Sequence, residues 1–395
     1  MKIQGDTAVK KLLFIAFNNF SNLHFGPTAK VFSQCRAFEA HGFDVELLGR
    51  IGSDTAIIND AENYRVTVRH KPVINNVRAR NLIDKHVQIK DIKQHIKNKS
   101  YDACYIRYDF SDGDFISLLK MLRKRCKKIV LELPTYPYDE ENKYGIGSKV
   151  RIAVDKIYRK QLHKYLDAIV TFYGEHKEIL GVPAIVIPNG FDFSRMELVK
   201  EKLPDDVTHI VAVSAMREWH GYERMIEGMH NYYADNSIEH RNFILHLVGE
   251  GREYGKYKAL IDEYKLHGHV LLEGAMFGEK LDALYEKCAI GVDSLARHRT
   301  GVDVLSSLKS REYGAKGIPF INSCKVDIID DDFPYMLRVP ADESPVDMTA
   351  VDAFCDRCNL QGDMRFETAE AIRSYVEAKS GMKQTLTKVV DFINR

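Results

Sequence analysis

The chain has 395 residues, of which 45% are hydrophobic and 29% charged, and this composition excludes a largely disordered protein. Its length predicts two domains rather than one core. The formal net charge of +1 argues against a general nucleic-acid-binding protein, so no nucleic-acid partner is expected.

The cysteines and the N-terminal segment indicate a cellular compartment. Seven cysteines at scattered positions form no disulfide framework and are typical of a reducing environment. Cys355 and Cys358 form a single CxxC, which we interpret as two thiols one helical turn apart because no second pair lies nearby. The apolar run in "KKLLFIAFNNF" is too short for a signal peptide or a membrane span. We therefore expect a cytoplasmic protein.

In the first half, short apolar runs alternate with amphipathic stretches, a pattern typical of parallel sheets covered by helices. Helical periodicity is clearest over residues 28–41 and 149–166. The predicted strands are 11–17, 44–50, 103–109, 128–134, 168–173 and 184–190.

A polar segment without steady periodicity follows Gly190, and we predict an interdomain linker over 191–207. The alternation then restarts, with predicted strands at 209–215, 243–249, 270–276, 289–295 and 318–323. The expected organisation is an N-terminal Rossmann-like domain (1–190), the linker, a second Rossmann-like domain (208–365) and terminal helices (366–395) that pack back toward the first domain. Two doubly wound α/β sheets in series predict ligand binding beyond the carboxyl ends of the strands, in a cleft between the domains.

Glycine-containing turns after the strands are the first candidates for a binding site. No strand is followed by G-x-G-x-x-G and no P-loop occurs, which disfavours hydride transfer and ATP hydrolysis. Gly249 begins a G-x-G that is also typical of a simple tight loop. Gly26, before Pro27, and Gly301, in "TGVDVLSSLK", each stand where a helix N-terminus could bind phosphate. Two such turns predict a diphosphate site that needs no metal or other cofactor.

The C-terminal half resembles a known enzyme family. The segments "VIPNGFD", "VSAMREWHGYERMIEGM", "LHLVGEGRE", "VLLEGAM" and "LKSREYGAKGIPFI" occur in the order found in the retaining GT-B glycosyltransferases of family 4. In the first half, "CYIRYD" and "LELPTYPYDEE" resemble its capsule and exopolysaccharide branch. The resemblance implies a GT-B fold, with a nucleotide sugar bound by the second domain and a saccharide or lipid-linked saccharide acceptor by the first.

The resemblance also implies roles for individual residues. Glu312 matches the glutamate that binds the ribose hydroxyls, and Lys309 and Arg217 match basic residues at the diphosphate, where they stabilise the leaving group. The alternative for Lys309 and Glu312 is a surface ion pair at i,i+3 spacing. His220 stands where many relatives have lysine, and a solvated turn is an equal alternative to a ligand contact. A leaving phosphate oxygen that takes the acceptor proton removes the need for a strong general base.

One departure concerns the donor sugar. The family pattern has a second acid eight positions before Glu312, and this chain has Val304 there. Contact with the sugar is then expected from the backbone amides near Gly301 and Val302. The polar candidates for acceptor binding in the first domain are His24, Glu132, Thr135, Tyr136 and Glu140.

Two further features have a structural and a functional interpretation. Asp112 and Asp114 in "SDGDF" imitate the D-x-D of metal-dependent transferases, but caps of a following helix are the favoured interpretation. The segment 149–166 combines lysines and arginines with apolar residues, which fits an ordinary solvated helix or peripheral contact with an anionic membrane.

The resemblance therefore implies a retaining hexosyltransferase of surface-polysaccharide biosynthesis. The alternatives are a GT-B sugar-nucleotide epimerase, which would convert the donor alone, and an inactive nucleotide-sugar-binding protein, which Val304 would explain.

Overall fold

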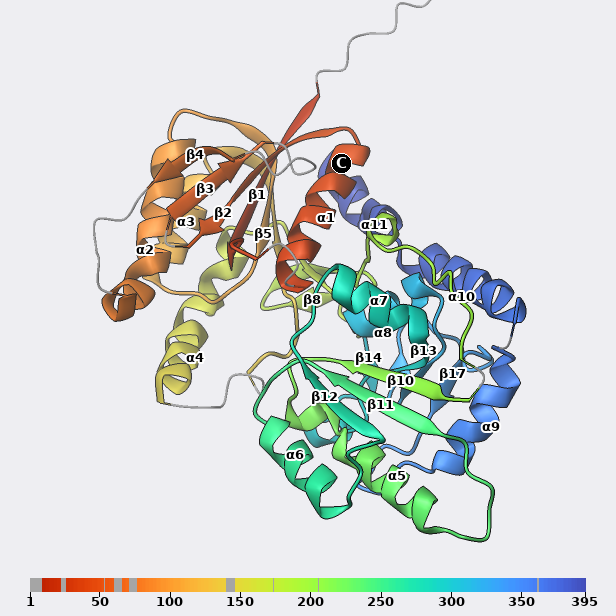
Figure 1. Cartoon of the computed structure of the whole chain (residues 1–395). Coiled ribbons are helices and arrows are strands. Elements are labelled where there is room, and N and C mark those ends of the chain that lie inside the picture. The colour runs from red at the N-terminus through yellow and green to blue at the C-terminus, as the bar shows by residue number, and fades with distance from the viewer. Residues whose placement is uncertain are drawn as a thin grey trace, which may run out of the picture. The chain divides into compact units, whose positions relative to one another are not determined.

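The computed structural model describes residues 9–22, 26–52, 54–59, 66–70, 77–139, 146–172, 174–204, 206–360 and 362–395, with side chains omitted for 66–70, 77–83 and 146–148. The chain divides into two compact units (Figure 1). The first contains Met1–Gly190 and Met382–Arg395, and the second contains Phe191–Gly381.

In its described part, the first unit contains a nine-stranded sheet of order β4-β3-β2-β1-β5-β6-β7-β9-β8. The strands β2, β1, β5, β6, β7 and β9 are mutually parallel, and β3, β4 and β8 join antiparallel. The strands are β1 Lys10–Asn19, β2 Phe43–Ile51, β3 Asp54–Ile58, β4 Val66–His70, β5 Tyr101–Arg107, β6 Cys126–Glu132, β7 Ala168–Thr171, β8 Glu178–Ile179 and β9 Val182–Val186. The helices are α1 Gly26–Ala40, α2 Val77–Ile96, α3 Gly113–Leu122, α4 Ile146–Tyr158 and α11 Met382–Asn394.

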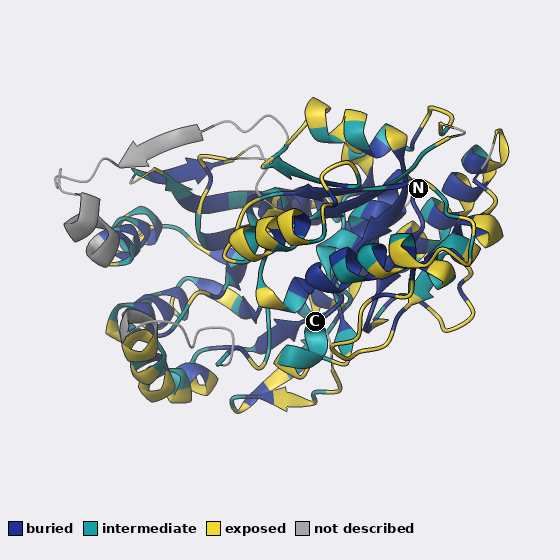
Figure 2. Ribbon diagram, turned by 60° about the horizontal axis from the view of Figure 1, so that its bottom comes forward, coloured by how far each residue is buried: buried dark blue, intermediate teal, exposed yellow. Residues whose placement is uncertain are grey.

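The sequence of the central strand β1 is almost continuously apolar because the strand is buried on both faces of the sheet. Leu12 to Ala16 are all fully buried. Successive side chains point to opposite faces of a strand, so Leu12 and Phe14 pack in one apolar cluster and Leu13 and Ile15 in another. Both faces of this parallel sheet are therefore covered, and Figure 2 shows the strands largely in the dark blue of buried residues.

The predicted strands of the first half are confirmed with shifted ends, and the hairpin β3–β4 was missed. It extends the sheet antiparallel from β2, with Leu48 opposite Ile57. The predicted helix over 149–166 is α4, which begins earlier at Ile146 and continues after Tyr158 as a 3-10 helix, Arg159–Lys164.

A partly buried carboxylate on β2 provides a stability test for the first unit. Burial raises the pKa of Glu46, but hydrogen bonds from His95 (3.0 Å), Lys99 (2.7 Å) and Tyr101 outweigh burial and lower the pKa to about 2. A carboxylate whose pKa is lowered by folding stabilises the folded state at pH values above its unfolded-state pKa. This stabilisation is lost as the pH falls through the folded-state pKa.

We expect Glu46→Gln to lower the free energy of unfolding by about 2 kcal/mol at pH 7, because the lowering of the pKa from 4.5 to about 2 is worth about 3 kcal/mol before screening by solvent at this partly exposed group. The difference from wild type should narrow as the pH approaches 2. Urea unfolding between pH 3 and pH 7 measures this. The exposed Glu178→Gln serves as control and should show no such trend. A constant gap across the pH range would contradict the role of ionised Glu46.

The described part of the second unit contains a six-stranded parallel sheet of order β12-β11-β10-β13-β15-β17. Its strands are β10 Thr208–Val213, β11 Phe243–Val248, β12 Val270–Gly274, β13 Cys288–Val292, β15 Phe320–Asn322 and β17 Met336–Arg338, and a separate pair is β14 Val304–Leu305 with β16 Lys325–Val326. The helices are α5 Glu223–Ala234, α6 Tyr254–Glu263, α7 Glu279–Lys287, α8 Leu308–Lys316, α9 Met348–Cys358 and α10 Met364–Ser380. The five predicted strands are confirmed, and β17 was missed.

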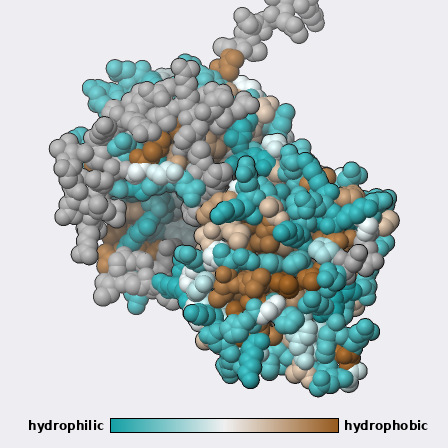
Figure 3. Space-filling model, viewed as in Figure 1, coloured by the Kyte–Doolittle hydropathy of each residue, from teal (hydrophilic) through white to brown (hydrophobic). Residues whose placement is uncertain are grey.

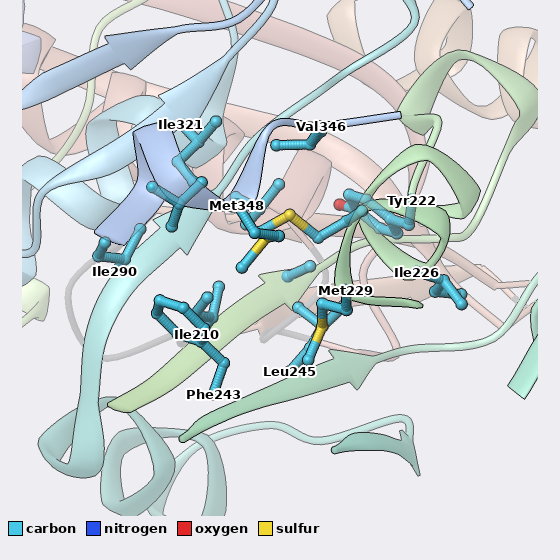
Figure 4. Packing of buried hydrophobic residues seen from close by; sticks show 14 of the residues in the cluster. Ile210, Tyr222, Ile226, Met229, Phe243, Leu245, Ile290, Ile321, Val346 and Met348 are labelled. Carbon is cyan, nitrogen blue, oxygen red and sulfur yellow. The ribbon is translucent and has the colours of Figure 1, made fainter. Parts of the chain in front are cut away.

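The main core of the second unit lies between the sheet and α5 (Figure 4). Ile226 and Met229 on α5 pack in one cluster with Ile210 of β10, Leu245 of β11 and Ile290 of β13. On the face seen in Figure 3, hydrophilic side chains cover much of the described surface, as the 29% charged content leads one to expect.

The structure places the segment predicted as a linker inside the second unit. Phe193 and Val199 are buried in a core cluster there, and Arg373 of α10 donates hydrogen bonds to the carbonyl oxygens of Phe193 and Met196, both at 2.8 Å. The terminal helices divide between the units. α10 packs on α8 in the second unit, whereas α11 contributes Leu386 and its apolar neighbours to a core cluster of the first.

Candidate functional site

The second sheet has a switch point between β10 and β13. These neighbouring strands lead to strands on opposite sides of the sheet, β11 beside β10 and β15 beside β13. Ligands of open α/β sheets bind outside the carboxyl ends of the strands at such a point. The loops that follow β10 and β13 are joined there by hydrogen bonds from the Leu295 amide to the His220 carbonyl (2.8 Å) and from the Ala296 amide to the Trp219 carbonyl (3.3 Å).

Lys309 lies in the first turn of α8 and reaches back to the loop after β13. Its Nζ lies 3.1 Å from Oδ1 of Asp293, which is fully buried, and 3.2 Å from Oγ of Ser294. Ser307, the N-cap of α8, donates to the other Asp293 oxygen and accepts from the Ser310 amide at 3.2 Å. A single buried carboxylate thus links the end of β13 to the start of α8.

Glu312 lies one turn further along α8 and does not pair with Lys309 in the described chain. Its Oε1 accepts a hydrogen bond of 2.9 Å from the hydroxyl of buried Tyr285 on α7. Among the described residues, its Oε2 accepts no hydrogen bond. The side chain is only partly buried, and burial raises its pKa. Lys309 and Glu312 therefore do not form the surface ion pair that their spacing allows.

Tyr313, Gly314 and Gly317, at the C-terminal end of α8, are used for packing. Tyr313 is buried, and its hydroxyl donates to the Val292 carbonyl at 3.0 Å. A Cβ on Gly314 would lie 2.7 Å from Val376 of α10, and one on Gly317 would lie 2.4 Å from Ala369. Gly317 also ends the helix with a φ of 74°, a conformation that favours glycine. This tight packing fixes the helix that presents Lys309 and Glu312.

Basic side chains gather around His220. The ring is buried, its Nδ1 accepts the Arg217 amide at 2.9 Å, and it stacks on Tyr222. Burial and the nearby charges of Lys309, Arg297 and Arg217 hold the pKa of His220 well below its usual range. His220 is therefore neutral, and the three cations make this loop region attractive to an anion.

The glycines after β11 bring two turns into close contact. Gly249 has a φ of 122°, and a Cβ there would lie 1.9 Å from the carbonyl oxygen of Ser214 after β10. A Cβ on Gly251 would lie 2.3 Å from the carbonyl oxygen of Met216. Both glycines therefore position the turn that leads to Arg217, and their role in this structure is close packing.

Gly301 and Val302 lie in a turn whose amides are already used. The Gly301 amide donates to the His298 carbonyl (3.1 Å), and the Val302 amide donates to the Arg297 carbonyl (3.3 Å). The helix predicted to begin near this turn starts later, at Leu308, because Val304 and Leu305 form β14 with β16. In this conformation the two amides are therefore not free to donate the predicted hydrogen bonds to a sugar.

The residues predicted for acceptor binding in the first unit differ in how far they are buried. Glu132 ends β6 and is fully buried, where its carboxylate accepts hydrogen bonds from Tyr105 (2.7 Å), Gln34 and Arg107. Because its carboxylate is enclosed by these donors, Glu132 has a structural role in this conformation. Thr135 and Tyr136 follow in the loop after β6 and are partly buried. Gly26, which was predicted for phosphate binding and not for the acceptor, is exposed as the first residue of α1. His24 and Glu140 lie outside the described residues.

The other features have structural roles where they are described. Asp112 caps α3 by accepting the Phe115 amide at 2.8 Å, which confirms the capping interpretation. Cys355 and Cys358 are buried free thiols on α9. Within the described ranges, no group of three or more His, Cys, Asp or Glu residues is placed to hold a metal ion.

Sequence reasoning missed four residues of this site: Arg224, Tyr285, Asp293 and Arg297. Arg224 on α5 is buried and donates to the carbonyl oxygens of Leu295, Pro340 (3.0 Å) and Ser344 (2.6 Å), so it fixes the loop after β13. Asp293 lies within the predicted strand 289–295 and directly follows the observed β13. An acid near the carboxyl end of a buried strand is a signal that could have identified it.

No protein-family model matches the chain, and no curated protein matches it. Solved structures do. Sucrose-phosphate synthase from Thermosynechococcus elongatus is 16% identical with a TM-score of 0.68, covering 98% of each chain. The lipopolysaccharide outer core galactosyltransferase WaaB is 13% identical with a TM-score of 0.57, covering 97% of this chain and 99% of that one. The pneumococcal O-GlcNAc transferase GtfA, solved with UDP and GlcNAc, is 10% identical with a TM-score of 0.53, covering 98% and 99%. At these identities the likeness establishes the fold, which is GT-B with two Rossmann-like α/β domains.

Proposed function

We propose that this GT-B chain is a cytoplasmic retaining hexosyltransferase of surface-polysaccharide biosynthesis. It transfers a sugar from a nucleotide-sugar donor to a saccharide or lipid-linked saccharide acceptor and requires no metal. The observation that carries the proposal is the arrangement at the switch point of the second sheet. There the charges of Arg217, Arg297 and Lys309 act on neutral His220, Lys309 pairs with Asp293 at 3.1 Å, and Glu312 presents a carboxylate oxygen on the same helix as Lys309.

Each part of this arrangement suits one part of a nucleotide sugar. A carboxylate with an available oxygen accepts hydrogen bonds from ribose hydroxyls, and cations at the loop after β10 suit a diphosphate. Two structural neighbours are a galactosyltransferase and an O-GlcNAc transferase solved with UDP and GlcNAc, which supports the same ligand class.

The proposed reaction breaks the bond between the anomeric carbon and the diphosphate and forms a bond from that carbon to the acceptor oxygen on the same face. Negative charge develops on the leaving diphosphate, where fixed cations stabilise the transition state more than the ground state. The acceptor proton passes to the leaving phosphate oxygen. Lys309 and Arg217 therefore act by electrostatic stabilisation, and the chain needs no strong general base.

One observation favours a second candidate, an inactive nucleotide-sugar-binding protein. The family pattern has an acid at the position of Val304, and this residue forms a strand pair with Lys325 in β16. Neighbouring Asp303 is exposed, and its carbonyl accepts the Lys325 amide at 3.1 Å. This candidate predicts nucleotide binding without turnover, so a transfer assay separates the two.

The first test is a thermal-shift panel of UDP, GDP, ADP and their sugar conjugates on wild type and Glu312→Ala. A ligand at about 100 times its dissociation constant adds about 2.7 kcal/mol of stability. We expect one nucleotide series to stabilise wild type and Glu312→Ala to lose most of this effect.

Glu263→Ala is the matched control, because Glu263 is exposed on α6. It should respond to the nucleotide as wild type does. If no nucleotide stabilises wild type, the proposed donor class is wrong. If Glu312→Ala is stabilised as strongly as wild type, the ribose does not bind at Glu312.

A further inference from the structure

The helix α4 has an exposed surface that the proposed reaction does not use. Val150 and Ile157 are 58% and 65% exposed, two of the five large hydrophobic side chains that are exposed in the described part of the chain. They stand seven residues apart, which places them on one stripe of a helix. α4 is the yellow helix at the lower left of Figure 1.

The charges beside this stripe are basic. The lysines and the arginine exposed on α4 and its 3-10 extension are Lys149, Arg151, Lys156, Lys160 and Lys164. Asp109 pairs with Arg151, and Asp139 pairs with Lys156 at 3.2 Å. Lys149, Lys160 and Lys164 form no ion pair with any described residue. As far as the described residues show, this surface thus combines positive charge that lacks an ion-pair partner with exposed aliphatic side chains.

The opposite face of α4 is fixed to the first unit, so rotation cannot bury the apolar stripe. Asp155, the acidic residue of α4, is fully buried. It accepts hydrogen bonds from the Tyr138 hydroxyl (2.7 Å), the Ser111 amide (2.7 Å) and the Tyr108 hydroxyl. Arg159 reaches Asp155 at 3.3 Å and Asp139 at 2.7 Å. These contacts hold Val150 and Ile157 outward.

We propose that α4 docks the first unit on an anionic phospholipid surface, with Val150 and Ile157 inserted between headgroups and the lysines beside them on lipid phosphates. Amphipathic helices with basic and aliphatic residues on the exposed face bind in the plane of such a surface. An acidic protein would satisfy the lysines but gives no reason for two exposed aliphatic side chains among them. None of the described helices is both long and apolar enough to cross a bilayer, so the contact is peripheral. The inference stands on α4 alone and does not depend on the transfer reaction.

Co-sedimentation of the full chain with phosphatidylcholine vesicles, with and without phosphatidylglycerol, tests the proposal. We expect binding to the anionic vesicles only. Neutralising Lys149, Lys160 and Lys164 to glutamine should lower the partition coefficient roughly 100-fold, because three basic residues near the surface are removed. Val150→Ser with Ile157→Ser should lower it at least about tenfold through lost apolar contact.

The matched control replaces Lys258, Lys280 and Lys388 by glutamine. They are exposed on α6, α7 and α11 and form no ion pair within the described ranges. This control changes the net charge equally and should bind as wild type does. Equal loss in the control triple would show that only net charge matters and would overturn docking by α4. Wild-type binding by the serine pair would overturn insertion of the apolar stripe, and absence of wild-type binding to anionic vesicles would overturn the proposal as a whole.

Discussion

Lys309→Met is expected to lower the rate of sugar transfer by about 100- to 1,000-fold and the free energy of unfolding by about 3 kcal/mol. The loss of rate follows from removing a cation at the leaving diphosphate. The loss of stability follows because Asp293 is fully buried and would lose the ammonium group 3.1 Å from its Oδ1. Removing one partner of a buried pair leaves an uncompensated charge.

A second variant separates the two consequences. Lys309→Met with Asp293→Asn removes both charges, and the asparagine side chain still accepts from the Ser307 hydroxyl. We expect this double variant to recover most of the lost stability but none of the lost rate. Urea unfolding measures the first quantity, and initial rates of transfer measure the second.

The result that would contradict this role is recovery of both quantities. Lys309 would then serve only to neutralise Asp293, and the site cation would have to be Arg217 or Arg297. Asp293→Asn alone provides a further check. It frees Lys309 from its counter-charge, so its transfer rate should stay well above that of Lys309→Met.

The residues of α8 could be predicted from sequence because their constraints are local. Tyr313, Gly314 and Gly317 have the spacing that one helix turn and its C-cap require, and they pack against Val292, Val376 and Ala369. Lys309 and Glu312 are the two polar residues of α8 for which the resemblance implied contact with a ligand, whereas Arg311 pairs with Asp327 and Lys316 with Asp282. The strand pattern was equally accessible because apolar runs such as Leu12 to Ala16 are buried on both faces of a parallel sheet.

Which residues pair with Glu312 and Lys309 could not be predicted, because their partners come from distant segments. Tyr285 lies 27 positions from Glu312, and Asp293 lies 16 positions from Lys309. Nothing in the local sequence of α7 distinguishes Tyr285 as a hydrogen-bond donor. Arg224 was missed for the same reason, since its acceptors are backbone carbonyl oxygens of loops 71 to 120 positions away.

Two parts of the fold escaped prediction for a different physical reason. The hairpin β3–β4 adds antiparallel strands at the edge of the first sheet, and its segments are short and flanked by polar residues. The helices α10 and α11 follow each other almost directly, so sequence periodicity gives no sign that they belong to different units. The apolar partners of each helix decide this division, and those partners lie elsewhere in the chain.

Gly249→Ala is expected to lower the free energy of unfolding by about 3–5 kcal/mol. A φ of 122° is strained for any residue other than glycine, and the added Cβ would lie 1.9 Å from the Ser214 carbonyl oxygen. Gly255→Ala is the matched control. Gly255 lies on α6 with no atom within 4 Å of the added Cβ, so alanine should leave stability unchanged or raise it by about 0.5–1 kcal/mol.

The same variant also tests how the site is held together. The Ser214 carbonyl belongs to the turn that ends at Arg217, and in this turn the Met216 amide donates a hydrogen bond of 3.1 Å to Ser214 Oγ. Relief of the clash must move either this turn or the one after β11. If the turn after β10 moves, nucleotide-dependent stabilisation should fall in the folded Gly249→Ala protein, whereas Gly255→Ala retains it. Full nucleotide stabilisation in Gly249→Ala would show that the turn after β11 yields instead and that the position of Arg217 does not depend on Gly249.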